Sequence, residues 1–138
     1  MLRYIIGDTL NVDGGAVGVL ICRDSTDAQL AATLVDHGAQ MLCIPTNNAM
    51  PPGRSEPYFV NDVRALDAQL AMAFGVPVIR ADVVGETRGL VSAGASMITQ
   101  PSARQLTASG AEEGELVIAE LSSRADALRS FGISMPAV

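Results

Sequence analysis

Cys22 stands at the junction of two predicted elements, in the stretch GVLICRDSTDAQL of residues 18–30. The apolar run Ala16 to Cys22 predicts a buried strand that ends at this thiol, and a helix is expected a few residues later. In open α/β sheets, ligands bind at the carboxyl ends of strands. The free N–H groups of a helix N-terminus favour a thiolate and can stabilise an oxyanion on an attacked carbonyl. Cys22 is therefore a candidate nucleophile, and the competing interpretation is a buried, inert cysteine.

Few other residues could assist such a thiol. Cys43 lies inside the predicted strand MLCI, away from any strand–helix junction, and is expected to be inert. His37 is the single histidine, and the helix dipole explains its place in the last turn of the first predicted helix. That helix would separate His37 from Cys22 by about 15 Å, so a Cys/His pair is not expected.

Composition restricts the class of protein. The 138 residues amount to about one domain, and no apolar run reaches the roughly 18 residues of a membrane span. A net charge of −6 without any basic cluster argues against a nucleic-acid partner. Two cysteines without metal-binding spacing, and an N-terminus without signal-peptide features, favour a reduced, cytoplasmic location. All 9 basic residues are arginines, so the chain has no lysine.

Strands and helices are expected to alternate, which predicts an α/β fold of the form βαβαβ followed by a β-meander in a mixed sheet. Thr26, with Gln29, is expected to cap the first helix, which ends at Gly38. Ser55 is expected to begin the second helix, which ends at Gly75. Because the later strands are separated only by turns, they are expected to pair antiparallel. The predicted strands are 16–22, 40–44 (closed by Pro45), 76–84, 90–99 and 115–121, and a tail with one short helix is expected over 122–138.

Four segments together resemble the nitrilase, or carbon–nitrogen hydrolase, superfamily. GVLICRD, preceded by GDTLNVDGGAV, resembles the family's nucleophile motif. HGAQMLCIPTNN resembles its G-A-x-x-x-x-x-P segment, and VPVIRADVVG its stretch before a V-G turn. GLVSAGASMITQPSARQL resembles its G-x-S-x-I-x-x-P strand, without the glycine that usually follows. The resemblance covers about residues 5 to 121 and implies half of an α-β-β-α sandwich, a mixed β-sheet with helices on one face.

The resemblance also implies a chemistry, in which a Cys, a Glu and a Lys hydrolyse a small-molecule amide or nitrile through a thioester, without metal or cofactor. By position, Cys22 would be the nucleophile, and the backbone N–H of Arg23 an oxyanion donor. Arg23 stands where the family usually has an aromatic residue. Asp24 would have a structural role in fixing the turn after the strand. The residues expected to border the substrate pocket are Thr46, Asn47 and Asn48, although plain turn chemistry also explains the two asparagines.

The chain departs from the family at the other two catalytic positions. In the family, both the Glu and the Lys precede the Cys, whereas here every glutamate follows Cys22 and no lysine is present. The resemblance therefore covers only the C-terminal, cysteine-bearing half of a family domain, so residues 1–138 are expected to form a single partial domain with 122–138 as a tail. The glutamates concerned are Glu56, Glu86, Glu112, Glu113, Glu115 and Glu120.

Three functional interpretations follow. The chain is the nucleophile half of an amidase-like hydrolase that needs a further N-terminal half or partner for activity, or it is a truncated, non-catalytic binding or structural module. A small cysteine hydrolase of the glutamine-amidotransferase type is a third, poorer match. Half of a sandwich would leave one sheet face uncovered, so a homodimer or larger assembly is expected.

Overall fold

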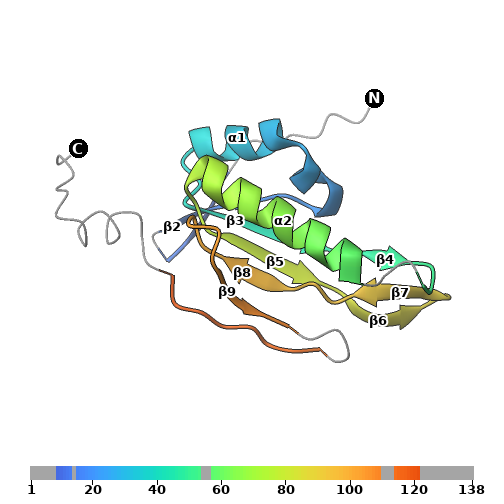
Figure 1. Ribbon diagram of the computed structural model, residues 1–138. Helices are drawn as coiled ribbons and strands as arrows, with labels where there is room; N and C mark the ends of the chain where they lie inside the picture. Colours follow the sequence, from blue (N-terminus) through green and yellow to red (C-terminus); the bar gives the residue numbers. More distant parts are fainter. Residues whose placement is uncertain (1–8, 14, 54–56, 110–113, 122–138) are drawn as a thin grey trace, which may run out of the picture.

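The computed structural model describes residues 9–13, 15–53, 57–109 and 114–121. A mixed sheet with strand order β1-β2-β3-β5-β8-β9 forms its centre, and a smaller sheet with order β4-β7-β6 extends from one end (Figure 1). The larger sheet comprises β1 (Leu10–Val12), β2 (Gly15–Val19), β3 (Met41–Thr46), β5 (Val78–Asp82), β8 (Met97–Thr99) and β9 (Gln105–Ala108). The smaller sheet comprises β4 (Ala49–Met50), β6 (Val84–Thr87) and β7 (Leu90–Ala93), and the helices are η1 (Cys22–Thr26, a 3-10 helix), α1 (Ala28–Asp36) and α2 (Pro57–Phe74).

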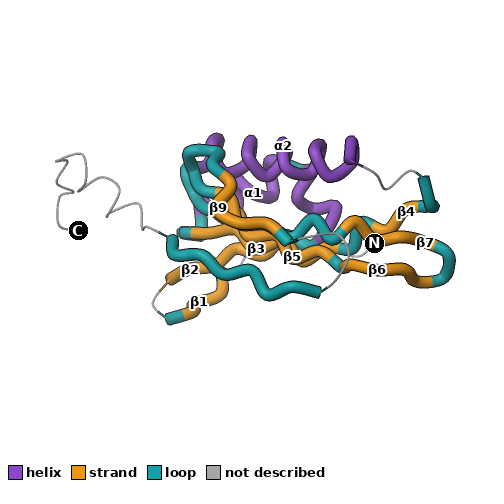
Figure 2. Tube along the Cα trace, turned by 60° about the horizontal axis from the view of Figure 1, so that its bottom comes forward, coloured by secondary structure: helices purple, strands orange, loops and turns teal. Residues whose placement is uncertain are grey.

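The expected α/β class and mixed sheet are confirmed. β2, β3 and β5 pair in parallel, whereas β1, β8 and β9 join antiparallel at the two sides. The chain crosses from β2 through α1 to β3, and from β3 through α2 to β5, so it moves across the sheet in one direction. Because such crossovers are right-handed, both helices lie on the same face of the sheet (Figure 2).

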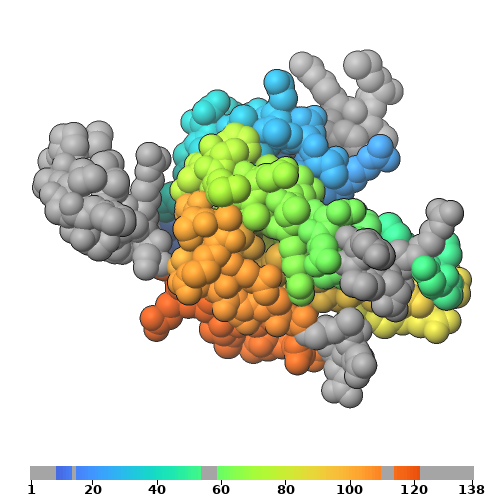
Figure 3. Space-filling model, in the orientation of Figure 1, coloured from blue at the N-terminus to red at the C-terminus, as the bar shows by residue number. Residues whose placement is uncertain are grey.

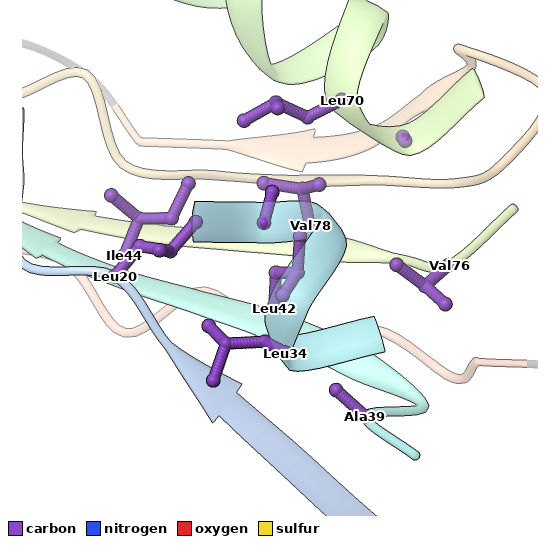
Figure 4. Close-up of a cluster of buried hydrophobic side chains, with 10 residues drawn as sticks. Leu20, Leu34, Ala39, Leu42, Ile44, Leu70, Val76 and Val78 are labelled. Carbon is purple, nitrogen blue, oxygen red and sulfur yellow. The ribbon is translucent and has the colours of Figure 1, made fainter. Parts of the chain in front are cut away.

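The main core lies between that face and the two helices. In β3, Leu42 and Ile44 are fully buried and point toward the helices, while Met41 and Cys43 face the other side and remain partly exposed. Burying apolar surface here supplies the main free energy of folding, at about 25 cal/mol per Å². Figure 4 shows the contributions of sheet and helices. The buried cluster comprises Leu20, Ala31, Leu34, Ala39, Leu42, Ile44, Leu70, Ala71, Val76 and Val78.

Two strand ends differ from the predicted ones. β2 stops at Val19, three residues before Cys22. β3 continues through Pro45 to Thr46 instead of closing at the proline. The reason is that the pairing of β2 with β3 ends at Cys43, so beyond it β3 has no strand on that side. A proline lacks the N–H that a partner strand would need there, and it is tolerated at such an edge.

Other predicted elements are divided or absent. The strand predicted over 76–84 forms β5 and β6, and the strand predicted over 90–99 is broken at Gly94, whose φ is +61°. Residues 115–121 form no strand, whereas β1, β4 and β9 were not predicted. The antiparallel pairing expected for the later strands is confirmed. Ser55 and the tail 122–138 lie outside the described residues.

The first helix begins later than predicted. Asp27, not Thr26, is its N-cap: the Asp27 carboxylate accepts a hydrogen bond of 2.9 Å from the N–H of Gln29. His37 is the exposed C-cap residue of the same helix, at the end away from Cys22, as expected. In the part of the chain that the structure describes, neither α1 nor α2 has the length and apolar character needed to cross a membrane.

Gly18 is the position at which α1 packs most closely on β2. A Cβ atom placed there would lie 3.0 Å from Leu42 Cδ2, 3.1 Å from Leu34 Cβ and 3.2 Å from Ala39 Cβ. We expect Gly18→Ala to lower the free energy of unfolding by about 1–3 kcal/mol, because these neighbours must move. Urea unfolding followed by circular dichroism measures the loss.

Gly15→Ala, in the same strand, is the matched control. Its nearest neighbours would lie 3.5 Å from the new methyl group, which is an ordinary contact. This substitution should leave stability unchanged or raise it slightly, because alanine restricts the unfolded chain. Equal losses at the two positions would contradict the close packing at Gly18.

Candidate active site

Cys22 is the first residue of η1 and lies in a strained turn after β2. Its φ is +50°, in the left-handed region that residues with a side chain rarely adopt. The N–H of Leu20 still donates to the carbonyl of Cys43, at 3.0 Å, so the chain follows β3 almost to the thiol. It then turns sharply, and the thiol sits on the turn.

Asp24 closes this turn through both its backbone and its side chain. Its N–H donates to the carbonyl of Ile21 at 3.0 Å, and its carboxylate accepts from the N–H of Ile21 at 3.1 Å. This reciprocal pair is the arrangement that a structural role for Asp24 requires. Ser25 and Thr26 add hydroxyl bonds of 2.8 Å to the carbonyls of Cys22 and Arg23, three residues earlier in each case.

The expectation that the thiol lies at the N-terminus of an α-helix is wrong. α1 begins at Ala28, and the residues between form the 3-10 helix η1. A dipole effect is confined to the first turn of a helix, so α1 cannot supply it at Cys22. The thiolate must therefore be favoured by individual groups.

Those groups come from several elements. The hydroxyl of Thr46 has the largest effect in lowering the pKa of Cys22, followed by the backbone N–H groups of Asn47 and Arg23 and the positive charge of Arg80. Partial burial opposes them, but the pKa remains below the usual value for a cysteine. For Cys43 burial acts alone, and it raises the pKa of that thiol.

The loop after β3 is held in place by its two asparagines. Asn48 donates from its backbone N–H and from Nδ2 to the carboxylate of Asp82, both at 3.0 Å. Asn47 accepts a 2.8 Å bond at Oδ1 from the hydroxyl of Ser92. These bonds join the end of β3 to β5 and β7, so the asparagines do more than form a turn. They fix the loop whose donors reach Cys22.

Asp82 and Arg80 are site residues that the sequence analysis did not identify. Besides Asn48, Asp82 binds the N–H of Ala95 at 3.0 Å. Arg80 forms a buried ion pair with Asp67 of α2. The one available signal was the segment VPVIRADVVG, in which two charged residues interrupt an apolar strand at alternate positions.

A cavity of about 330 Å³ opens at the thiol. One wall is apolar and belongs to α2, which contributes Phe59, Val63 and Leu66. Among the predicted pocket residues, Asn48 lines the cavity, whereas Thr46 and Asn47 do not line it but interact with the thiol. Figure 3 shows α2 in green across this side of the molecule. The remaining lining residues are Cys22, Arg23, Ser25, Thr26, Asp62 and Arg80.

This arrangement suits nucleophilic attack on a carbonyl or nitrile carbon. A thiol with a lowered pKa is partly exposed at a cavity, and backbone N–H groups of Arg23 and Asn47 lie beside it. Such donors can stabilise the negative charge that develops on the attacked group. Within residues 9–121, excluding the undescribed gaps, no three His, Cys, Asp or Glu side chains are grouped so that they could hold a metal ion.

Known proteins resemble the chain in sequence and in structure. The sequence profile of the carbon–nitrogen hydrolases matches residues 5–130. A protein named nitrilase from Pyrococcus abyssi is 37% identical over 106 residues, which are 76% of this chain and 36% of that protein. A carbon–nitrogen hydrolase from Helicobacter pylori superposes with a TM-score of 0.75 at 18% identity, over 83% of this chain and 43% of its own.

The amidase NitN from Nesterenkonia superposes with a TM-score of 0.70 at 25% identity, over 89% of this chain and 48% of its own. A variant of the same amidase, with a glutamate replaced by glutamine, shows the product of Michael addition of acrylamide at its active-site cysteine. The chain thus spans less than half the length of each of these relatives.

The two thiols should differ in reactivity. We expect iodoacetamide to alkylate Cys22 before Cys43 in the folded protein, because the lowered pKa of Cys22 gives more thiolate at neutral pH. Mass spectrometry of the two peptides, at increasing pH, measures both rates. Cys22 should react from a lower pH upward, and unfolding in urea should abolish the difference. Equal rates in the folded protein, or faster labelling of Cys43, would contradict the site.

Proposed function

The chain belongs to the carbon–nitrogen hydrolase family, and on that premise we propose that it carries the nucleophile of an amidase- or nitrilase-like hydrolase. Cys22 is the proposed nucleophile, and small-molecule amides or nitriles are the proposed substrates. The observation that carries the proposal is the convergence of donors from η1 and the β3 loop on a thiol held at a strained turn. A buried structural cysteine needs neither feature.

With an amide substrate, the proposed reaction has two halves. The Cys22 thiolate attacks the carbonyl carbon, an S–C bond forms, and the negative charge moves to oxygen, where the N–H of Arg23 stabilises it. When the oxyanion collapses, the C–N bond breaks, and the amine leaves with a proton to give a thioester. Water then attacks the thioester, and the acid and the free thiol are released.

Proton transfer is the part that this chain does not supply by itself. The family resemblance assigns it to a Glu and a Lys that precede the cysteine, and no lysine occurs in these 138 residues. His37 is exposed at the far end of α1. We therefore propose that the isolated chain can form the nucleophile site but cannot turn over. The non-catalytic interpretation also expects no turnover, but it does not expect a reactive nucleophile site.

Acrylamide separates the two interpretations. We expect the Cys22 thiolate to add to the double bond of acrylamide, with a proton taken up at the neighbouring carbon, and mass spectrometry should locate one adduct at Cys22. Ammonia release from a panel of amides should stay at the background level. A general base and an oxyanion charge are each worth about a hundredfold or more in rate, so little activity should remain without them.

A chimera provides the matched gain of function. The first half of the Pyrococcus abyssi nitrilase, placed before this chain, should restore ammonia release, and Cys22→Ser in the chimera should abolish it. Cys43→Ala should leave it unchanged. Rapid turnover by the isolated chain, lost in Cys22→Ser, would show that its catalytic partners lie within these residues. Absence of any acrylamide adduct at Cys22 would favour the non-catalytic module.

Assembly into a homodimer or larger oligomer is part of the proposal. Leu10 and Val12 of β1 are 58% and 56% exposed, and Leu116 and Ile118 are 86% and 77% exposed. Large apolar side chains that are this exposed can mark a surface for association. Light scattering should give a mass of at least two chains, and Val12→Lys should lower it. A monomer over a wide concentration range would contradict this prediction.

A further inference from the structure

A buried ion pair connects α2 with β5 directly behind the site. Nε and Nη2 of Arg80 donate to the two carboxylate oxygens of Asp67, at 2.8 and 2.6 Å. Asp67 is fully buried and Arg80 is 4% exposed. Removing two charges from water costs several kcal/mol per ion, and apolar residues of similar volume are often as stable or more so. Core packing alone therefore does not account for this pair.

The pair extends to the nucleophile. Nη2 of Arg80 also donates to the hydroxyl of Ser25 at 3.3 Å, and this hydroxyl donates to the carbonyl of Cys22 at 2.8 Å. Ser25 is itself 2% exposed. A continuous set of hydrogen bonds thus runs from α2, through the guanidinium, to the backbone of the strained residue. Arg80 and Cys22 also line the same cavity.

One edge of the guanidinium is not used by this network. No described residue accepts a hydrogen bond from Nη1 of Arg80. The Arg80 side chain is only 2% exposed, yet it lines the cavity. Asp67 therefore holds the guanidinium from behind, while its positive charge remains beside the cavity.

We propose that Arg80, oriented by Asp67 and Ser25, is the positioning residue that places a positive charge beside the Cys22 thiolate. The inference rests on the proposed function only in taking Cys22 as the nucleophile. Its effect on the pKa of Cys22 has the same direction, because the Arg80 charge lowers it. Asp67 carries the opposite charge and partly cancels the effect of Arg80, so the two partners shift the pKa of the thiol in opposite directions.

Other charged groups also face the thiol and must stay constant in a test. Arg23 and Asp24 flank it on η1, and Asp62 of α2 lines the cavity. Asp82 lies behind Asn48 at the end of β5. None of these is changed in the variants below, so a difference between them reports the Arg80–Asp67 pair.

The test is the pH dependence of Cys22 alkylation by iodoacetamide, a neutral reagent, in Arg80→Gln and Asp67→Asn. At a pH below the pKa of either thiol, Arg80→Gln should slow alkylation of Cys22 about two- to threefold, because an opposite charge is lost whose effect is smaller than that of the Thr46 hydroxyl. Asp67→Asn should speed it, because the guanidinium is no longer balanced. Arg80→Lys should recover most of the rate lost in Arg80→Gln.

Two controls are built into the chain. Cys43, in the same molecules, should keep its rate in every variant. Arg104→Gln removes an equal charge from the turn between β8 and β9, where Arg104 bonds Gln100, and should leave Cys22 unchanged. If Arg80→Gln does not fold because Asp67 is left unpaired, the double variant Arg80→Met with Asp67→Leu removes both charges and should still slow Cys22.

Opposite effects of Arg80→Gln and Asp67→Asn would support the proposal. Equal slowing in both, or no change in folded variants, would overturn it, because a merely structural pair affects the thiol equally through either partner. These results are independent of turnover. If Cys22 is reactive but its alkylation rate does not change in the Arg80 variants, this inference alone is refuted. If Cys22 forms no acrylamide adduct, the proposed function is refuted.

Discussion

The parallel alignment of β2, β3 and β5 is the constraint on which the site depends. In this register Val19 lies opposite Cys43, Cys43 opposite Ile79, and Thr46 opposite Asp82. The three strands therefore end at one edge of the sheet, and each delivers a part of the site just past or at its end. A slip of one residue would turn Arg80 to the opposite face and remove it from both Asp67 and Ser25.

The polar groups at this edge support one another more than they support the core. Asp82 is hydrogen-bonded to Asn48, and Ser92 to Asn47. Arg80 donates to Ser25, which connects it to the strained turn at Cys22. Every one of these bonds joins elements that are distant in the sequence. The apolar cluster beneath the helices makes the fold stable, whereas this set of bonds makes the edge of the sheet rigid. A nucleophilic thiol must be held within a fraction of an ångström of its substrate, so this rigidity is what the proposed role of Cys22 requires.

Local patterns were enough to predict the βαβαβ succession with its two helices, and they singled out Cys22, which the structure places at a cavity. They were not enough for its surroundings. The stretch CRDST has the composition of a helix start, but the hydroxyls of Ser25 and Thr26 bond carbonyls three residues earlier and favour a 3-10 helix. Arg80 and Asp67 are 13 residues apart, and Asn48 and Asp82 are 34 apart. No single-sequence pattern specifies such pairs.

At residues 115–121, by contrast, the local pattern predicts a strand that the structure does not form. Residues 115–121 contain the apolar run Leu116 to Ala119, which is typical of a strand, yet they pair with no described strand. Strand preference is largely a preference for a pleated neighbour, so the same residues form a strand only where a partner edge is present. The local sequence of residues 115–121 is compatible with a strand, but whether a strand forms depends on an available neighbouring strand.

The left-handed backbone at Cys22 has a consequence for how the position would change over generations. A residue with a side chain costs roughly 1–2 kcal/mol in this conformation, and glycine avoids that cost. Folding alone thus favours glycine at position 22. Without selection for the proposed chemistry, replacement of this cysteine by glycine would be favoured. A cysteine at a place where backbone stability opposes it is what the proposed nucleophile role predicts.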